Sequence, residues 1–167
     1  MKINISGLST GLHTFEVSTD ARALDLPENF TGVVTAHVAL EKTSWQIQAS
    51  IRAAVNAQFE CDRCADEYTR LVETTFDVVY SWNESERSDG DDDNYFLMTE
   101  GQKSIDVSEP VREYLLLAVP IKNLCRPNCR GLCPVCGANL NERTCTCTTG
   151  ETDSRWDALQ KLASQNE

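Results

Sequence analysis

The sequence is short of basic charge and has no long apolar run. Lysine and arginine together number 15, against 26 aspartates and glutamates, which gives a net charge of −11 at pH 7. So acidic a chain is a poor candidate for non-specific binding to nucleic acid or to an anionic membrane, and it suits a basic partner. The longest apolar run, Leu115 to Ile121, is far below the ~20 residues that span a bilayer. We therefore expect no membrane segment.

Targeting and catalytic motifs are also missing. The first ten residues, MKINISGLST, have neither the basic head nor the apolar stretch of a secretory signal, so we expect a cytoplasmic protein. The sequence has no G-x-S-x-G, Walker, H-E-x-x-H or G-x-G-x-x-G pattern. Its two histidines, His13 and His37, fall in predicted strands, far in sequence from most of the cysteines. These absences predict a protein that is not an enzyme and has no small-molecule substrate.

Alternation of apolar and polar residues dominates the first hundred positions and predicts strands. The clearest run extends from Trp45 to Phe59, where every second residue is apolar, and residues 72–82 repeat the pattern. Shorter strands are expected at 2–8, 12–17 and 34–40. Because consecutive alternating strands are joined by short connections, we expect an antiparallel, meandering sheet with one wet face.

One buried helix is expected after the strands. Ser108 is suited to cap its N-terminus, and Pro120 marks its end. An apolar stripe at i, i+3, i+4 and i+7 is widened by three further apolar residues, so the helix should be well buried. The stripe and its extension are Val111, Tyr114, Leu115, Ala118, Leu116, Leu117 and Val119.

The predicted fold class is therefore α+β: an antiparallel meandering sheet, one buried helix, and a cysteine-rich tail. A short helix from about Asp153 should close the tail, because its apolar residues fall on one stripe. We expect one domain over residues 1–167, with the sheet and helix in 1–121 and the metal-binding tail in 122–167 packed on it.

Charge is distributed unevenly along the chain. Residues 61–109 hold 4 basic and 14 acidic groups, a net of −10, whereas residues 110–167 hold 7 and 6, a net of +1. The acid is concentrated in NESERSDGDDD, residues 83–93, which has no periodicity and is expected to be a solvated loop. A basic protein could dock on it.

Eight cysteines are the most informative feature. In a reducing compartment, clustered cysteines bind metal more often than they form disulfides. Thiolates about two residues apart can hold one zinc ion from a tight turn, and Cys-Pro-Val-Cys-Gly fits such a turn well. We expect all eight to be ligands of structural zinc: Cys61, Cys64, Cys125, Cys129, Cys133, Cys136, Cys145 and Cys147.

Eight thiolates suffice for two four-cysteine sites. Locality predicts one site from Cys61, Cys64, Cys125 and Cys129, and a second from Cys133, Cys136, Cys145 and Cys147. A single site that uses four of the eight is an alternative, and iron is the second choice of metal. Thiol redox chemistry is a further alternative, although neither Cys-x2-Cys pair is predicted at a helix N-terminus, which would lower a thiol pKa.

Basic residues around the later cysteines form the one candidate surface for RNA, and a protein partner could contact them as well. They are Lys122, Arg126, Arg130 and Arg143, to which Arg63 of the first Cys-x2-Cys adds a fifth. Solvated loop residues that balance the thiolates would give the same pattern.

Two blocks of this sequence resemble the YceD family, also called the large ribosomal RNA subunit accumulation proteins. The first is ECDRCADEY, at 60–68; the second contains VREYLLLAVPIKNLC, RPNCRGLCPVCGANLN, a Cys-x-Cys and DSRWDALQKL. The matching positions are the eight cysteines with Arg63, Gly131 and Gly137.

The resemblance implies a non-enzymatic role in the accumulation of large-subunit ribosomal RNA, and hence in ribosome biogenesis. The partners would be that RNA, or ribosomal or assembly proteins of the large subunit. A zinc-stabilised protein-interaction module without a ribosomal role is the alternative.

Overall fold

A computed structural model describes residues 1–83, 94–147 and 155 of the chain. The chain divides into two compact units, Met1–Glu60 with Glu67–Asn123, and Cys61–Asp66 with Leu124–Glu167. We call them the sheet unit and the cysteine unit. The predicted single domain stays a prediction. Most of the acidic segment, 84–93, and the expected C-terminal helix, apart from Arg155, lie outside the described residues.

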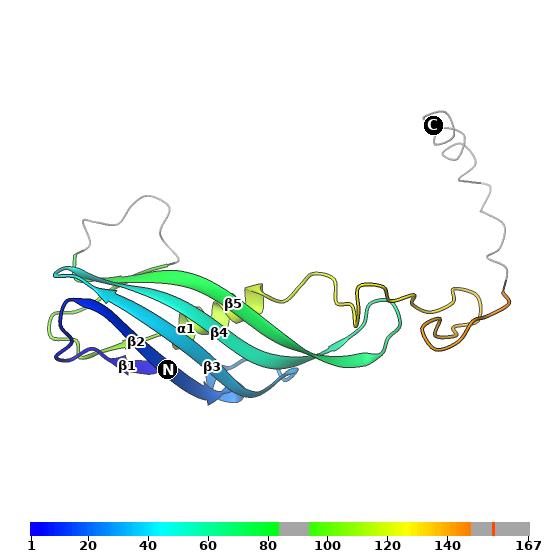
Figure 1. Ribbon diagram of the computed structural model, residues 1–167, viewed down its shortest axis with the longest axis horizontal. Helices are drawn as coiled ribbons and strands as arrows, with labels where there is room; N and C mark the ends of the chain where they lie inside the picture. Colours follow the sequence, from blue (N-terminus) through cyan, green and yellow to red (C-terminus); the bar gives the residue numbers. More distant parts are fainter. Residues whose placement is uncertain (84–93, 148–154, 156–167) are drawn as a thin grey trace. The chain divides into compact units, whose positions relative to one another are not determined.

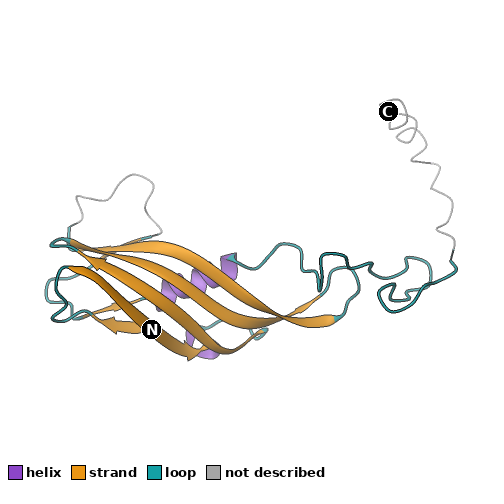
Figure 2. Cartoon of the chain, in the orientation of Figure 1, coloured by secondary structure: helices purple, strands orange, loops and turns teal. Residues whose placement is uncertain are grey.

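A five-stranded sheet forms most of the sheet unit (Figures 1 and 2). Its first four strands are long, and each pairs antiparallel with the next, which confirms the predicted meander. They are β2 (Gly11–Asp20), β3 (Phe30–Lys42), β4 (Gln46–Glu60) and β5 (Glu67–Ser81). A short 3-10 helix, η1 (Ala21–Leu24), follows β2.

Three short strands correct the predicted topology. β6 (Tyr95–Leu97) pairs with β5 in parallel, so the sheet is mixed rather than antiparallel. β1 (Lys2–Asn4) and β7 (Ser104–Asp106) form a separate two-stranded sheet. Strands of three residues are too short for alternation to reveal their direction or partner. With one α-helix among the described residues, the fold is mostly β rather than α+β.

Alternation along the long strands divides the sheet into a buried and a solvated face. In β4, Ile47, Ala49, Ile51, Ala53, Val55 and Ala57 are at most 1% exposed. The residues between them, from Gln48 to Gln58, are mostly exposed. Every second side chain of a strand points to the same face, so burying one face produces this pattern. The prediction for β4 is confirmed, except that Trp45 is 52% exposed.

The helix α1 (Ser108–Leu117) packs on the buried face against β4 and β5 (Figure 1). Val111 and Leu115 are fully buried in the core. The ring of Tyr114 stacks on that of Phe76 of β5 with centroids 4.1 Å apart, and its hydroxyl donates to Asn94. The predicted helix and its central stripe are therefore confirmed.

Both ends of α1 differ from expectation. The residue at the N-cap position is Val107, and the side chain of Asp106 accepts the backbone N–H of Ser108 instead. Leu117 is 76% exposed, so the buried face is narrower than the apolar composition indicated. The helix ends at Leu117, two residues before Val119. Pro120 disfavours a helical conformation at Val119, the residue that precedes it, so the helix is expected to end near this point.

Candidate metal centres

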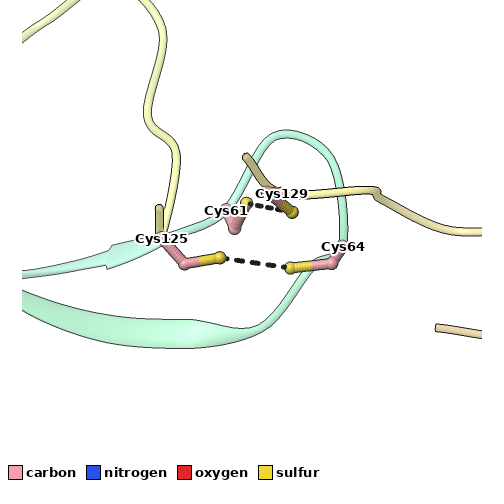
Figure 3. A group of neighbouring side chains, drawn as sticks. All are labelled: Cys61, Cys64, Cys125 and Cys129. Atoms are coloured by element: carbon pink, nitrogen blue, oxygen red, sulfur yellow. Dashed lines mark hydrogen bonds between the residues drawn. The ribbon is translucent and has the colours of Figure 1, made fainter. Parts of the chain in front are cut away.

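The turn between β4 and β5 supplies half of the first cysteine group. Cys61 and Cys64 face Cys125 and Cys129, which come from the segment that follows α1 (Figure 3). All four sulfur atoms lie within 4.8 Å of one another. The sulfur of Cys61 is 3.7 Å from that of Cys129, and the sulfur of Cys64 is 3.7 Å from that of Cys125. Three of the four cysteines are buried.

The second cysteine group closes within the later part of the cysteine unit. The sulfurs of Cys133, Cys136, Cys145 and Cys147 also lie within 4.8 Å of one another. Cys133 is buried, whereas Cys136 is exposed. The structure therefore brings the cysteines together in the same two sets that sequence locality predicted.

Backbone hydrogen bonds shape both cysteine turns. In the first, the N–H of Ala65 donates to the carbonyl of Cys61 (2.9 Å), and Ala65 adopts a left-handed conformation with φ of 57°. In the second, the N–H of Gly137 donates to the carbonyl of Cys133 (2.9 Å), and Gly137 has φ of 70°. Tight turns of this kind carry two cysteines on one side, where a single ion can reach both.

Gly131 allows the segment between the two groups to approach the first turn. A Cβ atom on this residue would lie 2.9 Å from the carbonyl oxygen of Arg63. The next residue, Leu132, donates its N–H to that same oxygen (2.9 Å). Arg63 returns a bond, because its Nη1 donates to the carbonyl of Cys129 (2.8 Å). Arg63 thus helps to hold the turn, a role that the sequence did not predict.

Two asparagines connect the groups and were also missed. Asn141 donates from Nδ2 to the sulfur of Cys129 (3.3 Å) and accepts the N–H of Arg130 (2.8 Å). Asn139 donates to both carboxylate oxygens of Asp66, at 3.0 and 3.2 Å. Its Oδ1 accepts two bonds from Asn141. Both asparagines lie in the GANLN block that carries the family resemblance, and this block was the one sequence feature that could have pointed to them. Residue spacing alone predicted no role for either.

Local hydrogen bonds favour a thiolate at some of the cysteines, and Cys61 and Cys133 show the largest lowering of pKa. Burial opposes ionisation of Cys61, but backbone N–H groups of Cys125 and of the turn itself outweigh it and lower the pKa to about 6. Backbone N–H groups of Cys136 and Val135 lower the pKa of Cys133 to about 6.

Other thiols in the same groups resist ionisation. The pKa of Cys147 rises to about 12, first because of its side-chain hydrogen bond with Cys136 and then because of burial. The pKa of Cys125 is raised as well, by burial first and then by its bond with Cys61. Four sulfurs this close cannot all hold negative charge unless a cation lies among them.

The donor set and spacing fit a tetrahedral metal ion. A Zn–S bond of about 2.3 Å places the sulfurs of a regular tetrahedron about 3.8 Å apart, close to the 3.7 Å of the two sulfur pairs in the first group and within the 4.8 Å limit that holds for both groups. A disulfide needs about 2.05 Å, and all eight cysteines are free. Each group can therefore hold a metal ion; four thiolates suit zinc or iron.

The remaining candidate residues are dispersed. His13 and His37 lie in β2 and β3 of the sheet unit, and neither belongs to a cysteine group. Lys122 also belongs to the sheet unit. Arg126, Arg130 and Arg143 are exposed in the cysteine unit.

A β-sheet unit and a unit built around two tetra-cysteine groups, each of which could hold a metal ion, define a class of cysteine-rich β protein. The family model for large ribosomal RNA subunit accumulation protein YceD matches residues 47–163, and the chain belongs to this family. No solved structure matches it. Among the described residues, no helix is both long and apolar enough to cross a membrane.

Plant relatives among the curated proteins carry the same family name. The Arabidopsis thaliana protein named large ribosomal RNA subunit accumulation protein YCED homolog 1, chloroplastic, is 25% identical over 84% of this chain and 51% of its own length. Its Zea mays namesake is 48% identical over 27% of this chain and 16% of its own length. An uncharacterized Mycobacterium tuberculosis protein is 27% identical over 48% of this chain and 39% of its own length. The chain thus spans about half, or less, of the relatives it matches, and their names indicate no catalytic role.

Proposed function

We propose that this protein is a non-enzymatic factor in the accumulation of large-subunit ribosomal RNA, and hence in ribosome biogenesis. Structural zinc in the two cysteine groups would stabilise it. Family membership over residues 47–163 is the observation that carries the proposal. The reducing cytoplasm is the proposed location, in keeping with eight free cysteines.

The cysteine unit is the proposed contact surface for ribosomal RNA or for a ribosomal or assembly protein. Arg126, Arg130 and Arg143 are exposed there, and no salt bridge among the described residues neutralises them. Arginine pairs with phosphate through its planar guanidinium, so these three are the best-suited side chains for RNA. Lys122 and Arg63 are secondary candidates for this contact. The guanidinium of Arg63 already donates a hydrogen bond to the carbonyl of Cys129, which leaves it fewer donors for phosphate.

The sheet unit is a poor surface for RNA. Its solvated face presents one arginine, Arg52, which pairs with Glu73 at 3.2 Å. Acidic side chains dominate the rest of that face and would repel phosphate. They are Glu16, Asp20, Glu41, Glu60, Glu67, Glu73 and Asp77. This face and the acidic segment at 83–93 would attract a basic ribosomal protein and repel RNA.

Sulfur grouping favours structural metal over thiol redox chemistry. A disulfide-exchange site works with a pair of thiols, whereas each site here gathers four. Three of the first group and Cys133 of the second are buried, which limits access for a partner thiol.

Ultraviolet crosslinking in cells, followed by purification of the tagged chain, tests the proposal. We expect crosslinks to large-subunit ribosomal RNA that weaken several-fold when Arg126, Arg130 and Arg143 are all replaced by glutamine. The matched control replaces Arg22, Arg52 and Arg70 of the sheet unit by glutamine, which removes the same charge and should leave the crosslinks unchanged.

Other recoveries have distinct meanings. Ribosomal or assembly proteins without crosslinked RNA would assign the contact to protein. Equal loss in both triple variants would show a general charge effect and exclude the arginine surface. Absence of both RNA and large-subunit proteins would contradict the ribosomal role and leave a zinc-stabilised interaction module.

A further inference from the structure

The segment Asn139–Leu140–Asn141 belongs to the second cysteine group by sequence and contacts the first by structure. It lies inside the loop between Cys136 and Cys145, two cysteines of the second group. Yet its side chains bond Cys129 and Asp66, which belong to the first group and its turn. The placement of this segment is therefore a physical link between the two groups.

Backbone pairing fixes the segment to the second turn. Asn139 forms an antiparallel bridge with Leu132, and the N–H of Leu140 donates to the carbonyl of Gly131 (2.9 Å). The N–H of Cys133 donates to the carbonyl of Ala138 (2.8 Å). A metal ion on the second group would tie both ends of this loop and so order the asparagines.

The bonds that the asparagines make would favour a charged, ordered first group. Asn141 directs an amide N–H at the sulfur of Cys129, and such a donor stabilises a thiolate. Asn139 donates to the side-chain carboxylate of Asp66, and the backbone carbonyl of Asp66 accepts the N–H of Cys61 (3.0 Å). Ordering the loop therefore prepares two of the four ligands of the first group.

We propose that the two cysteine groups load metal cooperatively, with Asn139 and Asn141 as the positioning residues that couple them. This inference rests on the structural zinc of the proposed function. Linkage requires that each ion raise the affinity for the other by the same factor. Two tetrathiolate centres repel each other electrostatically, so the coupling through the loop must outweigh that repulsion.

Native mass spectrometry of the full chain at one equivalent of zinc measures the coupling directly. Independent, equal sites would leave about half of the molecules with one ion, and unequal sites would leave more. A tenfold coupling lowers the one-zinc species to about a quarter, with metal-free and two-zinc molecules making up the rest. We expect a quarter or less for the unaltered protein.

Asn139→Ala and Asn141→Ala test the route. Removing an outer-sphere partner of a ligand costs about 10–100-fold in metal affinity, so the one-zinc species should rise above half in both variants. Alkylation of free thiols should then label Cys61, Cys64, Cys125 and Cys129. Asn128→Ala is the matched control, since this exposed asparagine precedes Cys129 and has no side-chain hydrogen bond in the described structure. It should behave as the unaltered protein.

Several results would overturn the inference. A one-zinc species of half or more in the unaltered protein would contradict the pairwise loading that coupling of the two groups predicts. Unchanged distributions in both asparagine variants, or an equal change in Asn128→Ala, would exclude the asparagine route. If no zinc bound at any ratio, the structural-zinc part of the proposed function would fail as well, whereas two ions bound without coupling would leave that part intact.

Discussion

Gly131 decides, as a single residue, how closely the segment between the cysteine groups approaches the first turn. Its φ of 74° lies in the left-handed region, where a side chain is strained. A Cβ atom would also lie 2.9 Å from the carbonyl oxygen of Arg63, which the N–H of Leu132 holds in place. Backbone atoms cannot move aside as a flexible side chain would.

Gly131→Ala should therefore weaken zinc binding at the first group more than Gly137→Ala weakens it at the second. Gly137 has a similar φ of 70°, but a Cβ there meets nothing within 4 Å. The control pays only the backbone strain of about 1 kcal/mol, whereas the test variant adds a steric term of about 1–3 kcal/mol. Competition with a chelator measures both. Equal losses would show that the close contact contributes nothing.

Residue spacing revealed the cysteines but not the residues around them. Thiolates that share an ion recur at short intervals, so Cys133 and Cys136 were evident from sequence alone. A hydrogen bond from Asn141 to the sulfur of Cys129 has no such periodicity, because it depends on how the loop folds back. Whether the eight cysteines bind metal stays a prediction.

Side chains within one element of the sheet unit differ in how deeply they are buried in the core. In α1, Leu115 is fully buried, whereas Leu117, two residues later, is 76% exposed. Both are leucines in a helix of ten residues, so they differ in burial and not in chemistry. The pair separates core packing from helix propensity.

Leu115→Ala should lower the free energy of unfolding of the sheet unit by about 2–5 kcal/mol, since it leaves a cavity in the core. Leu117→Ala should change it by less than about 0.5 kcal/mol. Denaturant unfolding followed by circular dichroism measures both. A comparable loss in the two variants would contradict the placement of α1 on the sheet.

Length explains which elements the sequence predicted. The long runs of alternation at residues 45–59 and 72–82 identify β4 and β5 as strands and show which face of each is buried. Three residues in β6 or β7 do not, and the parallel pairing of β6 with β5 depends on contacts distant in sequence. The prediction that Leu117 is buried was wrong for a related reason, because hydropathy alone does not say where a helix leaves the core.

The whole molecule consists of two compact units with different sources of stability. The sheet unit has an apolar core, from Ile3 to Leu115. In the cysteine unit, half of the cysteines that the structure places there are buried, and ligand bonds would replace much of a core. Loss of metal should therefore affect the two units unequally.

Chelation of zinc should expose the amides of Leu132, Cys133 and Leu140 to hydrogen exchange and leave the β4–β5 ladder protected. Cys133→Ser should do the same at the second group, with loss of its ion and retention of the sheet. Exchange followed by mass spectrometry, with zinc restored as the control, measures both. Equal exposure of the β4 and β5 amides would show that the sheet unit itself requires metal.

The separation in sequence within the first group also bears on when it can form. In its two close sulfur pairs, the cysteines are separated by 61 and by 68 positions in the sequence, whereas the second group closes within fifteen residues. Closing the longer loop costs about 1 kcal/mol more in chain entropy, and contacts of this range slow folding. During synthesis, the first group can be completed only after residue 129 has left the exit tunnel, when β2 to β5 are already outside. Metal capture at this group would therefore follow the synthesis of the long strands, and it would tie the segment after α1 to the turn between β4 and β5.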